Sequence, residues 1–158
     1  MSNPAPQRQN MRGPADEPRA AREPGNQAPA AASPPPLRIF LVENNPDTRE
    51  LMGLLLAQAG HVVGSAATMA AALEAIPAFA ADMLISDIGL DDGTGWELLG
   101  LLGESRPPYA IAMSGFGTPV DRENSRAAGF RHHLLKPVVP ASLDLLLDEV
   151  RQERGGAR

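Results

Sequence analysis

The stretch MLISDIGLDDG at residues 83–93 decides the fold. A β-type run, residues 83–86, leads directly into Asp87, and the Gly and Asp residues that follow favour a loop. Open α/β sheets bind their ligands at the carboxyl ends of buried strands. The pattern therefore predicts a central strand that ends in a functional carboxylate.

Three other β-type runs also end in polar residues. These runs and the residues that follow them are 37–42 with Glu43 and Asn44, 109–113 with Ser114, and 132–135 with Lys136. If the strands are parallel neighbours, their carboxyl ends meet at one edge of a sheet. Two acids, an amide, a hydroxyl and an ammonium would then converge there, which predicts a phosphoryl-transfer site.

Helical patterns separate these strands, and each begins at a residue that favours a helix start. The predicted starts are Pro46 with Asn45 as cap, Thr68, Thr94, Thr118 with Pro119, and Pro140. A further short strand is predicted at residues 61–64. Five strands alternating with five helices predict an α/β fold, a flavodoxin-like (βα)5 doubly wound parallel sheet with strand order 2-1-3-4-5.

Leucines at helical spacing are predicted to face the core. In the first helix these are Leu51, Leu54 and Leu55. The second helix is expected to end near Pro77, because proline removes a backbone donor and crowds the preceding turn. The loop residues 91–93 are expected to serve the turn rather than a metal.

Composition separates residues 1–36 from the rest. This segment holds more than half of the 16 prolines and almost no Val, Ile, Leu or Phe. It buries too little apolar surface to offset the entropy of ordering, so a disordered Pro/Ala-rich N-terminal arm is predicted. Residues 37–154 are predicted to form the folded domain, and residues 155–158 a flexible C-terminus.

Charge and residue usage narrow the function classes. The net charge is −5, from 14 basic and 19 acidic residues, and there is no cysteine. No basic stripe is present, so we expect no nucleic-acid partner. No stretch approaches the roughly 20 apolar residues of a membrane span, and no apolar signal core is present, so a cytoplasmic location is expected.

Four motifs at the predicted strand ends resemble those of response-regulator receiver domains of bacterial two-component signalling. They are LVENN at 41–45, SDIGLDDGTG at 86–95, MSG at 113–115 and LLKP at 134–137. The resemblance covers residues 37–150 and implies a role for each matching position. Asp87 would be the phosphoacceptor, Glu43 and Asn44 the pair that holds Mg²⁺ with the Gly89 carbonyl, Ser114 the switch hydroxyl, Lys136 the phosphate-binding lysine, and His133 the switch side chain.

The resemblance also implies partners and a mode of action. Asp87 would take a phosphoryl group from a sensor histidine kinase or a histidine phosphotransfer protein, as part of a phosphorelay. A downstream protein would bind the face formed by the fourth helix, fifth strand and fifth helix. No enzymatic activity beyond self-phosphorylation and dephosphorylation is expected, and no output domain, because only residues 151–158 follow Val150. The resemblance further implies a cis Lys136–Pro137 bond.

Two positions depart from the family pattern. Asn44 stands where the family most often has Asp, so Mg²⁺ is expected to bind more weakly. His133 replaces the usual aromatic residue, which would make the switch side chain sensitive to pH.

The same residues allow alternatives to a phosphorylated receiver. The first is a receiver-like protein-interaction module with a degenerate metal site that works without phosphorylation. The second is a hydrolase using Ser114, Asp121 and His133, but no Gly-x-Ser-x-Gly motif surrounds Ser114.

Overall fold

The structure is a computed structural model that describes residues 34–156. The predicted arm, except for its last three residues, and residues 157–158 lie outside the described residues. None of the described helices is long and apolar enough to cross a membrane.

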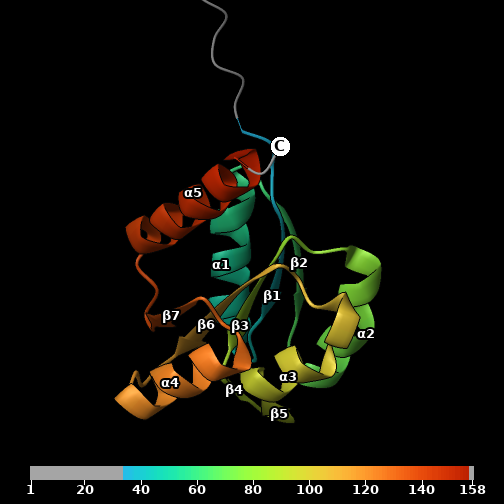
Figure 1. The fold of residues 1–158 in the computed structure, drawn as a ribbon, viewed down its shortest axis with the longest axis vertical. Helices are drawn as coiled ribbons and strands as arrows, with labels where there is room; N and C mark the ends of the chain where they lie inside the picture. The colour runs from blue at the N-terminus through green and yellow to red at the C-terminus, as the bar shows by residue number, and fades with distance from the viewer. Residues whose placement is uncertain (1–33, 157–158) are drawn as a thin grey trace, which may run out of the picture. The chain divides into compact units, whose positions relative to one another are not determined.

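A five-stranded parallel sheet forms the centre of the described part (Figure 1). Its strands are β1 (Arg38–Val42), β2 (Val62–Ala66), β3 (Met83–Asp87), β6 (Tyr109–Ser114) and β7 (His132–Leu135). The order β2-β1-β3-β6-β7 is the predicted 2-1-3-4-5 order. The predicted fold class is therefore confirmed.

Five α-helices cover the two faces of this sheet (Figure 1). They are α1 (Pro46–Gln58), α2 (Met69–Phe79), α3 (Gly95–Leu101), α4 (Pro119–Ala128) and α5 (Pro140–Gly156). Alternate residues of β1 point to opposite faces: Phe40 packs in the core with α2 and α3, and Ile39 packs with α1 and α5. The last helix continues two residues beyond the predicted domain end at Arg154.

The predicted helix caps are confirmed. Asn45 accepts a hydrogen bond from the Thr48 amide, and Thr68 accepts one from the Ala71 amide. Thr94 and Thr118 each form a reciprocal capping box with the acid three residues later. These caps fix the starts of the helices that follow the site loops.

The predicted core face of α1 was wrong in part. Leu51 and Leu54 are 58% and 54% exposed, whereas Met52 and Leu56 are buried. Apolar residues occur on nearly every side of this helix, so spacing alone did not select the buried side. The observed stripe repeats at i and i+4, which suits packing against a sheet.

Helix α2 ends within two residues of Pro77, close to its predicted end. Pro77 lies inside the helix, which continues to Phe79 and ends at Ala80 in a left-handed conformation. The Phe79 ring packs edge-on against Phe40 at a centroid distance of 5.4 Å, and the Arg38 guanidinium lies over it and donates to the Phe79 carbonyl. These tertiary contacts hold the last turn despite the missing donor.

Two short elements were not predicted. The site loop after β3 contains a two-residue antiparallel ribbon of β4 (Gly89–Leu90) and β5 (Gly93–Thr94). A 3-10 turn, η1 (Gly103–Ser105), follows α3. Both are too short to carry a periodic pattern.

Candidate functional site

Three charged side chains meet at the carboxyl edge of the sheet. The Lys136 ammonium lies 2.7 Å from Oδ2 of Asp87 and 2.6 Å from Oε2 of Glu43. Glu43 directly follows β1 and Asp87 is the last residue of β3. The two strands are neighbours, because Val42 of β1 pairs with Ser86 of β3. Lys136 arrives from the end of β7, its amide donating to the Ser114 carbonyl, and the Lys136–Pro137 bond is cis as predicted.

The site is buried and carries an excess of negative charge. Glu43 is fully buried and Asp87 is 7% exposed. Partial burial by itself lowers the pKa of Lys136, but hydrogen bonds from its ammonium to Asp87 and Glu43, and their charges, outweigh burial and raise it. Two carboxylates therefore share one ammonium, which leaves a negative charge at the edge of the sheet.

The carboxylates of Glu43 and Asp87 also bind backbone amides of the site loops. Glu43 Oε1 accepts from the Asn45 amide at 2.9 Å, and Asp87 Oδ1 accepts from the Gly89 amide at 3.1 Å. Oε2 of Glu43 is buried and faces the Lys136 ammonium at 2.6 Å. Two neighbouring buried carboxylates that share a single ammonium fit a hard cation such as Mg²⁺.

The donor set suits a cation that keeps much of its water. No three acidic, histidine or cysteine side chains gather into a metal cluster in the described part of the chain. Mg²⁺ commonly binds through one or two carboxylates and retains several waters, so Glu43 and Asp87 match its needs.

Asn44 and the two loop acids take different roles. The Asn44 amide nitrogen donates to Asp91 Oδ1 at 3.1 Å. The Asp92 carboxylate accepts from the Met69 and Ala70 amides at 2.7 and 2.9 Å, so it caps α2. These backbone hydrogen bonds, from Ala70 and then Met69, lower the pKa of Asp92. The two loop acids thus bind groups of the first site loop and of α2, in place of the local turn role that was expected.

Ser114 and His133 are in direct contact. The Ser114 hydroxyl donates to the Phe116 carbonyl, and its oxygen lies 2.7 Å from Nε2 of His133. Nδ1 of His133 lies 3.0 Å from the hydroxyl of Ser125 in α4. Trp96 in α3 donates its indole N–H to the same hydroxyl at 3.0 Å. Ser125 was not predicted to join the site, because it does not follow a strand.

The charge state of His133 follows from this environment. Burial lowers the pKa of His133, and the nearby Arg122 charge lowers it further, against the opposite effect of Asp121. The ring is therefore neutral near pH 7. Its adjacent His132 points elsewhere and lies 3.4 Å from Glu149.

The structure does not form the Ser-His-Asp arrangement of a hydrolase. Ser114 and His133 are within hydrogen-bond distance, but the second ring nitrogen meets Ser125. The Asp121 carboxylate instead binds the Thr118 hydroxyl at 2.7 Å as part of the α4 cap. No carboxylate contacts His133 within residues 34–156, so the general base lacks its orienting acid.

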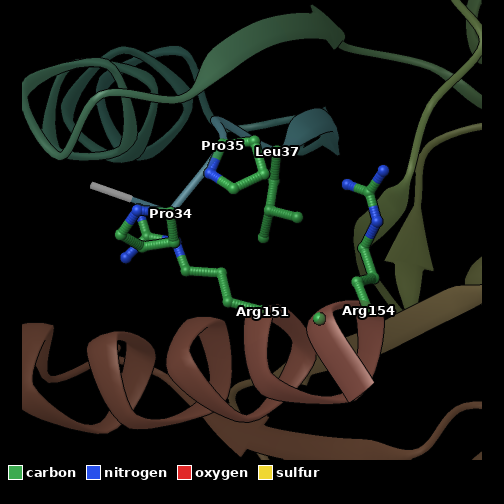
Figure 2. A pocket seen from close by; sticks show the side chains of 6 residues that line it. Pro34, Pro35, Leu37, Arg151 and Arg154 are labelled. Atoms are coloured by element: carbon green, nitrogen blue, oxygen red, sulfur yellow. The ribbon is translucent and has the colours of Figure 1, made fainter. Parts of the chain in front are cut away.

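A hollow lies at the amino end of β1, the opposite end from the charged site (Figure 2). Pro34, Pro35 and Leu37 line one side, and Arg151 and Arg154 of α5 line the other. Leu37 precedes β1, whose far end leads into Glu43, so this hollow is separate from the charged site.

Comparison with known proteins gives one consistent family. Residues 39–148 match the model of the response regulator receiver domain. An uncharacterized 14.6 kDa protein of Leptolyngbya boryana is 32% identical over 116 residues, which cover 70% of this chain and 87% of that protein. The transcriptional regulatory protein BtsR of Escherichia coli K12 is 26% identical over 124 residues, 75% of this chain and 49% of BtsR.

A solved structure is similar throughout its length. The crystal structure of a CheY-like response regulator receiver domain protein from Methanospirillum hungatei superposes with a TM-score of 0.72 at 26% identity, over 78% of this chain and 100% of that one. The sheet order, the charged strand ends and these matches agree. The chain therefore belongs to the response regulator receiver domain family.

Proposed function

We propose that Asp87 accepts a phosphoryl group and that the resulting charge changes the protein's surface to signal to a partner. The observation that carries this proposal is the Lys136 ammonium held between the buried carboxylates of Asp87 and Glu43. A buried strand-end carboxylate paired with a lysine is a nucleophile with a cation ready for the incoming phosphoryl oxygens. We infer a signalling domain whose only chemistry is its own phosphorylation and dephosphorylation.

The transfer exchanges one bond at phosphorus for another. A carboxylate oxygen of Asp87 forms a P–O bond while the P–N bond of a phosphohistidine breaks. The leaving imidazole keeps the electron pair and takes up a proton. Lys136, already 2.7 Å from Oδ2 of Asp87, would hold a phosphoryl oxygen as charge develops, and the Ser114 hydroxyl would hold another.

Mg²⁺ is the cofactor that we propose for this site. Glu43, Asp87, the Asn44 amide oxygen and the Gly89 carbonyl would hold it, and it would neutralise the carboxylates and phosphoryl oxygens that meet there. Asn44 supplies a neutral oxygen where a carboxylate would supply charge, so we expect weak affinity. The buried carboxylates of Glu43 and Asp87, which share one ammonium, support the assignment.

The proposed partners follow from the same chemistry. A sensor histidine kinase or histidine phosphotransfer protein would supply the phosphoryl group. The downstream target would bind the face of α4, β7 and α5, where Val120, Leu135 and Leu145 are 67%, 47% and 72% exposed. The cytoplasmic location and the absence of a nucleic-acid partner stay predictions.

A second candidate is a receiver that signals through protein contacts without phosphorylation. The observation that favours it is Asn44, whose amide nitrogen is bound to Asp91 in place of a charged metal ligand. The two candidates differ in one measurable property, which is phosphoryl transfer to Asp87.

The test is the intact mass of the protein after incubation with acetyl phosphate and Mg²⁺. We expect one added phosphoryl group in the wild type and in Asp144→Ala, which removes an exposed acid of α5. The label should be absent in Asp87→Ala and without Mg²⁺. An unlabelled wild-type protein would favour the phosphorylation-independent module, and a labelled Asp87→Ala would place the acceptor elsewhere.

A further inference from the structure

Ser125 is a nearly buried hydroxyl that connects three elements. It is 1% exposed, lies in α4, and contacts both the Trp96 indole of α3 and the His133 ring of β7. Ser125 and Trp96 lie outside the four motifs that resemble the family. The contact chain ends at Ser114, which lies one residue beyond Met113, the residue paired with Asp87.

The positions of the protons along these contacts follow from which atoms can only donate and which can only accept a hydrogen bond. The Phe116 carbonyl only accepts, so the Ser114 hydroxyl donates its proton there and must accept from Nε2 of His133. A neutral ring with its proton on Nε2 leaves Nδ1 as an acceptor. The Trp96 indole only donates, so Ser125 accepts from Trp96 and gives its own proton to Nδ1.

We propose that Ser125 is a positioning residue that holds His133 in the Nε2–H tautomer and thereby links the position of Ser114 to α3 and α4. All four contacts are satisfied by this one arrangement of protons. If His133 carried its proton on Nδ1, Ser114 would lose its donor. The side chains of Trp96, Ser125, His133 and Ser114 are called the hydroxyl–imidazole chain below.

The hydroxyl–imidazole chain explains how phosphorylation of Asp87 would reach α3 and α4. The Ser114 hydroxyl is bound to Phe116 and His133, so it must leave these partners before it binds a phosphoryl oxygen on Asp87. His133 Nε2–H then loses its acceptor, and the ring, Ser125 and Trp96 must rearrange together. This consequence rests on the proposed phosphorylation of Asp87, but the tautomer of His133 does not.

The experiment is nitrogen NMR of the full chain labelled with ¹⁵N-histidine, at slightly alkaline pH. Among the three histidines, the His133 signals are identified by their loss in His133→Gln. We expect His133 as a single Nε2–H tautomer in the wild type. Ser125→Ala should lose this single-tautomer signature, and Ser125→Thr, which keeps the hydroxyl, should restore it. A Nδ1–H ring or a mixture in the wild type would overturn the proposal even if no variant folds.

A second arm separates this inference from the proposed function. The protein is treated with acetyl phosphate and Mg²⁺, and the intact mass is recorded beside the His133 signals and the signal of the single Trp96 indole N–H. A labelled protein whose His133 and Trp96 signals both shift supports the link. A labelled protein without either shift refutes the link and leaves the phosphoacceptor in place. An unlabelled protein refutes the proposed function, and the tautomer measurement still decides the role of Ser125.

Discussion

At the scale of single residues, the site depends on how few cations face its carboxylates. Lys136 is shared by Glu43 and Asp87, and the Asn44 amide is held by Asp91. A negative charge added at position 44 would therefore have two effects. It would strengthen a cation site, and it would place a second carboxylate against Asp91.

Asn44→Asp should raise Mg²⁺ affinity by roughly tenfold, because ligand charge sets the affinity of such sites. Without Mg²⁺ the same variant should melt at a lower temperature, because the new carboxylate replaces a donor 3.1 Å from Asp91 Oδ1. Calorimetric titration and thermal melts measure both effects. The double variant Asn44→Asp with Asp91→Asn is the control, and it should recover the melting temperature. Unchanged Mg²⁺ affinity in Asn44→Asp would count against the assigned metal position.

Stability should fall as the pH drops below about 6.5. Burial lowers the pKa of His133 and of His61 from 6.5, helped by the charges of Arg122 and Arg151 respectively. Nδ1 of His61 also accepts a hydrogen bond from the Leu37 amide, and protonation of that nitrogen would remove the bond. The unfolded chain therefore takes up protons first, and stability is lost from pH 6.5 down through the lowered folded pKa values.

Urea unfolding at several pH values between 5 and 8 measures this effect. His61→Gln removes one of the two groups, so its stability should depend less steeply on pH than that of the wild type. Equal slopes in the two proteins would show that His61 does not contribute.

At the scale of elements, the start of α3 is packed directly against the phosphoacceptor strand. A Cβ placed on Gly95 would lie 2.6 Å from the Asp87 carbonyl oxygen, and the Gly95 amide donates to the Ile88 carbonyl. Because the crowded atom is backbone, it cannot move aside as a flexible side chain would. The first residue of α3 thus sets the position of the loop that follows Asp87.

Gly95→Ala should lower the free energy of unfolding by about 1–3 kcal/mol, the usual cost of forcing atoms into a packed site. Gly100→Ala is the matched control in the same helix, because nothing lies within 4 Å of its added Cβ. That change should be neutral or stabilising by up to about 1 kcal/mol. Denaturant unfolding measures both. Equal effects of the two changes would mean that helix propensity, not the contact with Asp87, decides the outcome.

Sequence patterns predicted where helices and strands occur better than which side of a helix is buried. The strand ends at Glu43, Asp87 and Lys136 were found because a polar residue interrupts a β-type run, and the structure brings these three together. The buried side of α1 was missed because apolar residues surround that helix. Spacing placed the end of α2 only to within two residues, because its last turn packs against Phe40 and Arg38, which are distant in sequence.

The partners of the site residues could be predicted least. Ser125 is a buried polar residue in the middle of an otherwise polar helix, and no local pattern separates it from its exposed neighbours. Its contacts with Trp96 and His133 exist only once α3, α4 and β7 are packed. Long-range hydrogen bonds between side chains have no signature in spacing.

At the scale of the whole molecule, the sheet order gathers the charged residues at the carboxyl ends of the strands. It places the expected output surface of α4, β7 and α5 at the side of the sheet where β7 is the last strand. β3 carries Asp87 in the middle of the sheet, and β6 lies between it and the edge strand β7. Ser114 ends β6 and His133 lies in β7. A phosphoryl group on Asp87 would act on α4 and β7 through these two residues, and only its differential contacts in the two states could shift the equilibrium.

The most direct test is amide hydrogen exchange over residues 115–135 before and after treatment with acetyl phosphate and Mg²⁺, in the wild type and in Ser114→Ala. We predict that both proteins gain a phosphoryl group on Asp87, but that exchange in this segment changes only in the wild type. The Ser114→Ala protein lacks the hydroxyl that would move from Phe116 and His133 to the phosphoryl group. The same exchange changes in both labelled proteins, or none in the labelled wild type, would contradict the account.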